Sequence, residues 1–315
     1  MSRSKMNIIF ALLFFLSCTR LTAQLEALKT WTDQVTEVQH IPSFKSAQRY
    51  IQSQQLDSAL YHLTLLDSTL QQNSLKEESI ALNLLLGKIY CTDLQAYEQA
   101  KKPLKQALKQ ISKNDQSSTY LEAVDLLTAS FYWLFQSEEA FQYAIEGLDF
   151  SKNIENGAYE LTFTQWMGKI LAIQGELGKA LEYYAKGLEL ALKTDDPLQK
   201  YEAYLNIGCC SYKNKQPEKG LAYLANCTQY LNEIDQREKR QADVWMWSGI
   251  MNVEIAQYEQ GISLLTQALP VFDRLNIPNR RMHTRLELGK AYLREGKNRD
   301  AIKIIEETLQ LDVEK

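Results

Sequence analysis

Histidine and cysteine are scarce in this 315-residue chain, which contains three histidines and five cysteines. His40, His62 and His283 fall on different predicted elements, and no pair of cysteines has the spacing and histidine company of a zinc site. The sequence also has no P-loop, no nucleotide-binding glycine fingerprint, no nucleophile elbow and no calcium-binding loop. We therefore expect no enzyme activity, no cofactor and no metal site.

Clusters of basic residues are absent as well, and the formal net charge is −4. Loss of residues 1–23 would remove Arg3, Lys5 and Arg20 and no acidic residue. Lys plus Arg would then fall from 35 to 32 against 39 Asp plus Glu, so the net charge would become −7. Because excess negative charge opposes nonspecific binding to nucleic acid and anionic lipid, nucleic acid is not an expected partner.

Long apolar runs are missing except at the amino terminus. Arg3 and Lys5 precede the apolar run Ile8–Leu16, and small and polar residues follow as far as Ala23. This order is typical of a secretory signal peptide, and the run is far shorter than the ~20 residues of a membrane-spanning helix. We predict that residues 1–23 are a signal peptide, that the mature protein is exported to the periplasm or secreted, and that it does not insert into a membrane.

Cys18 offers an alternative route of processing. It directly follows the apolar run in Phe15-Leu16-Ser17-Cys18, which resembles a bacterial lipoprotein site, although Phe15 stands where that family usually has leucine. Lipid attachment at Cys18 would tether the protein to a membrane surface, whereas cleavage after Ala23 would release it.

Four cysteines remain after cleavage at Ala23: Cys91, Cys209, Cys210 and Cys227. Export would permit disulfides, and a bond from Cys209 or Cys210 to Cys227 is one interpretation. The favoured interpretation is that Cys227 is a small apolar residue, because the equivalent position of most other repeats is occupied by alanine or glycine.

Sustained period-two alternation is missing, so the sequence predicts no strands. Small residues instead recur in steps of 40 or 41 residues, which makes an internal repeat the first hypothesis to test. One series is Ala47, Gly87, Thr128, Gly168, Gly208, Gly249 and Gly289. A second series is Ala59, Ala100, Ala140, Ala180, Gly220, Gly261 and Ala301, and a third, seven residues further on, is Leu66, Ala107, Gly147, Gly187, Cys227, Ala268 and Thr308.

These series predict a repeated pair of antiparallel helices in which small residues allow close packing. In the central repeat, we expect Ala180 on the second helix to face Gly168 on the first. Stacking of such hairpins would bury an apolar face that no single hairpin can bury alone.

The pattern resembles the tetratricopeptide repeat family. The match is clearest in Leu288-Gly289-Lys290-Ala291-Tyr292 with Gly296, Ala301 and Ile305, and Leu86-Gly87-Lys88-Ile89-Tyr90 repeats its first part. The spacing departs from the family's ~34 residues, and Ala47 and Thr128 replace the usual glycine. The resemblance implies an all-α, right-handed superhelical α-solenoid of about seven helix-turn-helix repeats with a concave binding face.

The predicted organisation is one elongated domain. Residues 24–39 form an amino-terminal capping helix, which Leu25, Leu28, Trp31 and Val35 place at helical spacing. The predicted repeats are 40–74, 80–115, 121–154, 161–194, 201–234, 242–275 and 282–315. The charged Asp312 on the outer face of the last helix is the reason to expect a natural end at Lys315.

The resemblance places the residue after each small residue of the first helix in the concave groove, which gives Lys88, Lys169, Cys209, Ile250 and Lys290. One turn further on lie Tyr132, Trp133, Tyr212, Lys213 and Arg294. Lysines beside aromatic rings could bind an extended peptide through its carboxylates and apolar side chains. The candidate groove residues are Lys88, Tyr132, Trp133, Lys169, Tyr212, Lys213, Lys290 and Arg294.

The sequence therefore predicts an exported, non-enzymatic scaffold that binds a protein or peptide in its groove. One alternative is a sensory or regulatory module whose output lies in a partner chain, and another is an enzyme or an enzyme subunit. Ile304, Ile305 and Leu311 give the carboxy-terminal helix a candidate surface for self-association.

Overall fold

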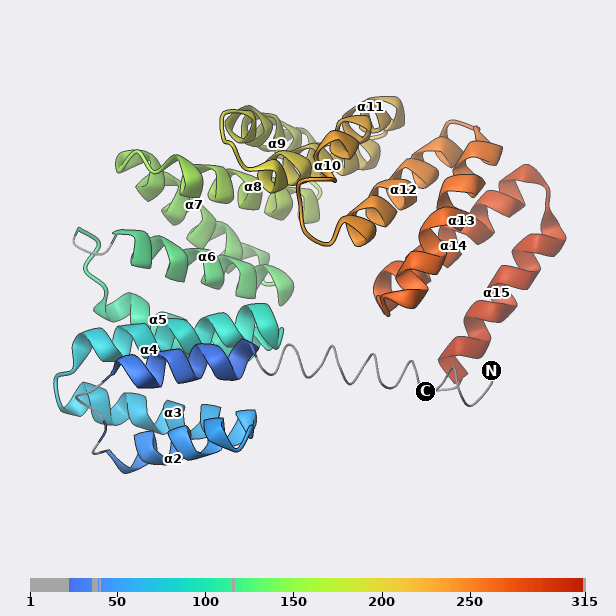
Figure 1. Cartoon of the computed structure of the whole chain (residues 1–315). Coiled ribbons are helices and arrows are strands. Elements are labelled where there is room, and N and C mark those ends of the chain that lie inside the picture. The colour runs from blue at the N-terminus through green and yellow to red at the C-terminus, as the bar shows by residue number, and fades with distance from the viewer. Residues whose placement is uncertain (1–22, 36–38, 40, 115–116, 314–315) are drawn as a thin grey trace. The chain divides into compact units, whose positions relative to one another are not determined.

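The computed structural model describes residues 23–35, 39, 41–114 and 117–313, with side chains as far as residue 309 (Figure 1). Residues 1–22 of the predicted signal peptide, which include the lipidation candidate Cys18, lie outside the described residues, as does His40. Within the described ranges the chain is helical and has no strand, so the predicted all-α fold is confirmed. The chain divides into two compact units, of which the first ends at Glu155 and the second begins at Asn156.

The first unit contains a helix over residues 23–34 and three hairpins. The hairpins are α2 (Pro42–Gln52) with α3 (Leu56–Gln72), α4 (Lys76–Lys88) with α5 (Tyr97–Gln110), and α6 (Ser117–Trp133) with α7 (Ser137–Asn153). The end of α4 continues into a π-helical segment, η1 (Ile89–Asp93). Each helix from α2 to α7 contacts the next along the chain, so the unit is a stack of hairpins (Figure 1).

The second unit contains four hairpins built in the same way. They are α8 (Gly157–Ile173) with α9 (Leu177–Leu192), α10 (Pro197–Lys213) with α11 (Pro217–Cys227), α12 (Arg237–Glu254) with α13 (Tyr258–Arg274), and α14 (Pro278–Glu295) with α15 (Asn298–Val313). A short 3₁₀ segment, η2 (Thr228–Tyr230), follows α11. Pro217 stands in the first turn of α11, where the missing N–H of proline costs no helical hydrogen bond.

Glycine pairs allow close helix approaches in the second unit. A Cβ built on Gly220 would lie 2.9 Å from the carbonyl oxygen of Gly208, and one built on Gly261 would lie 2.9 Å from that of Gly249. In the central hairpin, a Cβ on Gly168 would meet the ring of Tyr184 at 2.7 Å, so this glycine makes room for a tyrosine ring of the second helix.

Left-handed backbone conformations end most first helices. Gln54, Gln95, Phe135, Gly175, Lys215, Ala256 and Gly296 all have φ between 53° and 83° at the tips of their hairpins. Only two of these positions carry glycine, the residue that adopts this conformation without a steric cost. The other five turns are therefore held by the packing of the helices that they connect.

The amino-terminal helix is shorter than predicted. It covers residues 23–34 instead of 24–39, with Val35 outside the helix and Gln39 in a turn. Leu25, Leu28 and Trp31 are buried in one core with residues of α2, α3 and α4, and the ring of Trp31 lies 6.2 Å from that of Phe44.

The predicted repeat boundaries also differ from the observed hairpins. The second hairpin begins at Lys76 and not at residue 80, and the third begins at Ser117 and not at residue 121. The right-handed superhelical path of the whole chain stays a prediction.

Cys91, Cys209, Cys210 and Cys227 are free thiols in the structure. Cys227 is fully buried, and burial raises the pKa of its thiol to about 12. These observations agree with its interpretation as a small apolar residue.

Among the described residues, no helix has the length and apolar character needed to cross a membrane. The same part of the chain has no group of three or more His, Cys, Asp or Glu side chains placed to hold a metal ion.

Candidate functional site

The first helices of the second unit carry a continuous aromatic row. Tyr212 of α10 lies 6.3 Å from Trp247 of α12, measured between ring centroids, and Trp247 lies 5.7 Å from His283 of α14 in an edge-to-face arrangement. The three rings are partly buried and come from three consecutive hairpins. Such offset and edge-to-face contacts stabilise the row beyond simple burial.

Charged residues flank the row and are paired with one another. Lys290 Nζ lies 2.7 Å from Glu287 Oε1, and Arg294 Nη1 lies 2.8 Å from Glu254 Oε2. Burial raises the pKa of Tyr212, and the charges of Glu287 and Glu254 raise it further. The hydroxyl of Tyr212 therefore lies within the field of both acids. We call Tyr212, Trp247, Glu254, His283, Glu287, Lys290 and Arg294 the first-helix cluster.

His283 is the titratable ring of the first-helix cluster. Burial lowers its pKa, the positive charges of Arg280 and Lys290 lower it further, and Glu287 opposes them. Its Nε2 lies 3.7 Å from Glu287 Oε1, so a protonated His283 would have a partner for its charge.

The sequence placed three members of this cluster among its candidates: Tyr212, Lys290 and Arg294. It missed Trp247, His283, Glu254 and Glu287. Tyr212, Trp247 and His283 are 35 and 36 residues apart, so they fall outside the 40- to 41-residue repeat series, and that series could not reveal the aromatic row.

The remaining groove candidates lie in varied surroundings. Lys88 pairs with Glu122 at 3.2 Å, the ammonium of Lys169 lies 4.6 Å from the centre of the Trp166 ring, and Lys213 is exposed. Lys88 and Lys169 therefore already have partners. A ligand carboxylate could replace Glu122 at Lys88 at little cost, because an exposed ion pair contributes only about 0–1 kcal/mol.

The two aromatic candidates of α6 and the groove position Ile250 differ in their exposure. Tyr132 is partly buried, and burial raises its pKa. Trp133 is exposed and stacks on Tyr97 of α5 at 6.1 Å, which ties it to a second helix. Ile250 is buried, so the expectation that it points into the groove is wrong.

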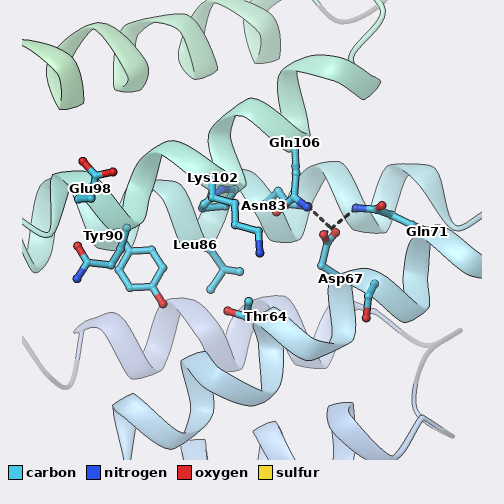
Figure 2. A pocket seen from close by; sticks show the side chains of 12 residues that line it. Thr64, Asp67, Gln71, Asn83, Leu86, Tyr90, Glu98, Lys102 and Gln106 are labelled. Carbon is cyan, nitrogen blue, oxygen red and sulfur yellow. Dashed lines mark hydrogen bonds between the residues drawn. The ribbon is translucent and has the colours of Figure 1, made fainter. Parts of the chain in front are cut away.

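The first unit contains a cavity of about 520 Å³ between α3, α4 with η1, and α5 (Figure 2). This size falls within the ~300–1,000 Å³ range of ligand pockets. Its walls include Thr64 and Asp67 of α3, Leu86 and Tyr90 of α4 and η1, and Lys102 and Pro103 of α5. No sequence argument predicted this cavity.

Comparison with solved structures supports the fold. The apo form of RapI is similar, with a TM-score of 0.69 and 12% identity over 85% of this chain and 95% of that one. A Rap protein complexed with competence and sporulation factor matches with a TM-score of 0.61 and 14% identity over 93% of this chain and 90% of that one. No family model matches the sequence, and no curated protein matches it.

A third similar structure is PH0952 from Pyrococcus horikoshii, a signal transduction ATPase with numerous domains and a tetratricopeptide repeat sensor. Its TM-score is 0.62 at 16% identity, and the match covers 99% of this chain but only 47% of that one. The chain described here thus has the fold of tetratricopeptide-like helical repeat proteins.

Proposed function

We propose that this protein is a non-enzymatic scaffold that binds an extended peptide, or a segment of a partner protein, along the first helices α10, α12 and α14. The observation that carries the proposal is the first-helix cluster, in which one aromatic row is bordered by exchangeable ion pairs. Peptide side chains can pack on the rings of Tyr212, Trp247 and His283. Lys290 and Arg294 can exchange their partners Glu287 and Glu254 for carboxylates of the peptide.

The hairpin stack favours binding because the surface is already formed before the ligand arrives. A preorganised site loses little conformational entropy on association. The charges are balanced within the cluster, which suits a partner with mixed polar and apolar side chains. The similar Rap protein is described in complex with a competence and sporulation factor, and this supports the choice of a peptide-like ligand.

Export belongs to the same proposal. The order of basic, apolar and small residues in residues 1–23 supports a periplasmic or secreted protein, with lipid attachment at Cys18 as the alternative. Metabolic labelling with palmitate, compared between the native chain and Cys18→Ser, distinguishes the two. Label on the native chain alone would establish the lipoprotein.

The binding proposal is tested with a phage-displayed peptide library selected on the chain from Gln24 onward. Selected peptides are then titrated against Lys290→Gln with Arg294→Gln, and against the control Lys303→Gln, an exposed lysine of α15. Loss of two charge-assisted contacts should weaken acidic peptides about tenfold or more. Equal affinity for both variants, or no selected peptide, would contradict the proposal.

A sensory module with its output in a partner chain is the second candidate function. The similarity over 99% of this chain to a structure described as having a tetratricopeptide repeat sensor favours it. A peptide that changes the affinity of the chain for a second protein would support this alternative.

A further inference from the structure

The cavity of the first unit contains a buried negative charge with neutral partners. The carboxylate of Asp67 is 4% exposed and accepts hydrogen bonds from Gln71 Nε2 at 2.7 Å, Ser79 Oγ at 2.6 Å and Asn83 Nδ2 at 2.5 Å. No cation lies within ion-pair distance of it among the described residues. Because a buried carboxylate is costly without an opposite charge, this site gains from a ligand that supplies one.

A positive charge lines the same cavity. Lys102 of α5 is exposed and makes no ion pair within the described ranges, and Figure 2 shows its ammonium pointing into the cavity. Asp67 and Lys102 therefore border one space without contacting each other.

Two departures from regular α-helix shape the walls of the cavity. Tyr90 lies in the π-helical segment η1, and such segments often occur at functional sites. Pro103 lies inside α5 and has no N–H, so the carbonyl of Gln99 does not receive its usual helical hydrogen bond. Gln99, Pro103 and Leu86 all line the cavity.

We propose that this cavity binds a small zwitterion, namely a free amino acid or a peptide of two or three residues. Its ammonium group lies against Asp67, its carboxylate pairs with Lys102, and its hydrocarbon part packs on Leu86 and Pro103. Opposite charges that line one cavity, Asp67 and Lys102, distinguish such a ligand from a simple cation or a simple anion. The site belongs to the first unit and is independent of the first-helix cluster.

The experiment is isothermal titration of the chain from Gln24 onward with two probes, L-leucine and trialanine. Each probe is also used with its amino group acetylated and with its carboxylate amidated. The variant is Lys102→Gln, and the matched control is Lys109→Gln, an exposed lysine on the same helix. Thermal melting without ligand verifies that Lys102→Gln leaves the fold unchanged.

We expect saturable binding of at least one unmodified probe and loss of binding when its amino group is acetylated. Lys102→Gln should weaken the unmodified probe about tenfold, as expected for one charge-assisted contact, and leave the amidated probe unaffected. Leucine and trialanine distinguish a free amino acid from a short peptide. Absence of binding by both probes, equal binding to Lys102→Gln and Lys109→Gln, or destabilisation by Lys102→Gln without ligand would overturn the proposal.

Loss of cavity binding leaves the proposed function intact, because its test uses Lys290 and Arg294 on the other unit. A Lys102→Gln protein that still binds the selected library peptides shows that the two sites are separate.

Discussion

Gly249 and Gly289 occupy the same place in consecutive hairpins, yet alanine should have opposite effects at the two positions. A Cβ at Gly249 would lie 2.8 Å from Cγ of Leu265 and 3.0 Å from the carbonyl oxygen of Gly261. A Cβ at Gly289 would lie no closer than 3.4 Å to any neighbour, the nearest atom being Cγ2 of Ile304. Alanine is therefore overpacked at the first position and accommodated at the second.

Two opposing free energies decide the result. Alanine stabilises a helix interior by about 1 kcal/mol relative to glycine, whereas overpacking a filled core costs about 1–3 kcal/mol. The carbonyl of Gly261 belongs to the backbone and cannot rotate away, so the cost is paid in full at Gly249. We expect Gly249→Ala to lower the free energy of unfolding by up to about 2 kcal/mol and Gly289→Ala to raise it by up to about 1 kcal/mol.

Hydrogen exchange with mass spectrometry is the appropriate measurement, because a chain of two units need not unfold in one step. Peptides from α12 and α13 should lose protection in Gly249→Ala, and peptides from α14 and α15 should gain it in Gly289→Ala. Unchanged protection in Gly249→Ala, or equal loss in both variants, would refute the reasoning from the Cβ distances.

Three further outcomes are expected. Phe135 is 80% exposed and has a φ of 58°, so Phe135→Gly should stabilise the α6–α7 hairpin by about 0.5–1 kcal/mol, which hydrogen exchange would report as greater protection. Gly175→Ala at the matching turn should lower the protection of α8 and α9, and the opposite changes would contradict the argument from φ. Burial lowers the pKa of His283 below 6.5, so the folded state binds fewer protons than the unfolded state between the two values. The free energy of unfolding should therefore fall on acidification through that window, and His283→Gln should remove this part of the pH dependence. NMR titration of the imidazole C2 proton should report a pKa under 6.5, and a value above 6.5 would contradict the burial argument. Leu286, Ile305 and Leu309 are 53%, 45% and 61% exposed on the last hairpin, so light scattering should show self-association of the native chain. Substitution of these three residues by lysine should abolish the self-association, whereas the control Leu65→Lys on α3 should not. A monomeric native chain would rule out this surface for self-association.

Close helix packing was predictable from the sequence, because a glycine that recurs on a helix has no Cβ and allows a second backbone to approach. Gly208 with Gly220 and Gly249 with Gly261 meet through their backbones, as the small-residue series predicted. The starts of the hairpins after the first were placed four or five residues too late, because first turns such as Lys76-Glu77-Glu78 are polar and carry no apolar periodicity.

Side-chain directions at the edge of the groove were harder to predict. Position 250 follows the spacing of the internal repeat, but an apolar side chain at a boundary position turns toward the core, and Ile250 is buried. Ile304 was assigned to a surface for self-association and is also buried, whereas its neighbour Ile305 is exposed. The side chain of Leu311 lies outside the described residues.

The ion pairs and the cavity depend on contacts between hairpins, which one sequence does not reveal. Glu254 and Arg294 are 40 residues apart, and either could have been an isolated surface charge. Pro103 lies inside α5, but the space beside it depends on what α3 and α4 leave unfilled.

The α4–α5 hairpin differs from the two neighbouring hairpins because it contains the π-helical segment η1 and has Pro103 inside its second helix. Chains of this architecture can grow by copying one hairpin over another, and such a copy would preserve the stack. Replacing the α4–α5 sequence with the regular α8–α9 sequence would remove the cavity beside Asp67. The helix content of the protein would stay the same. In a repeat protein of this kind, a ligand site can depend on the one hairpin that departs from the regular pattern. A redesign toward a uniform consensus repeat would therefore give a more stable protein without the proposed ligand site beside Asp67.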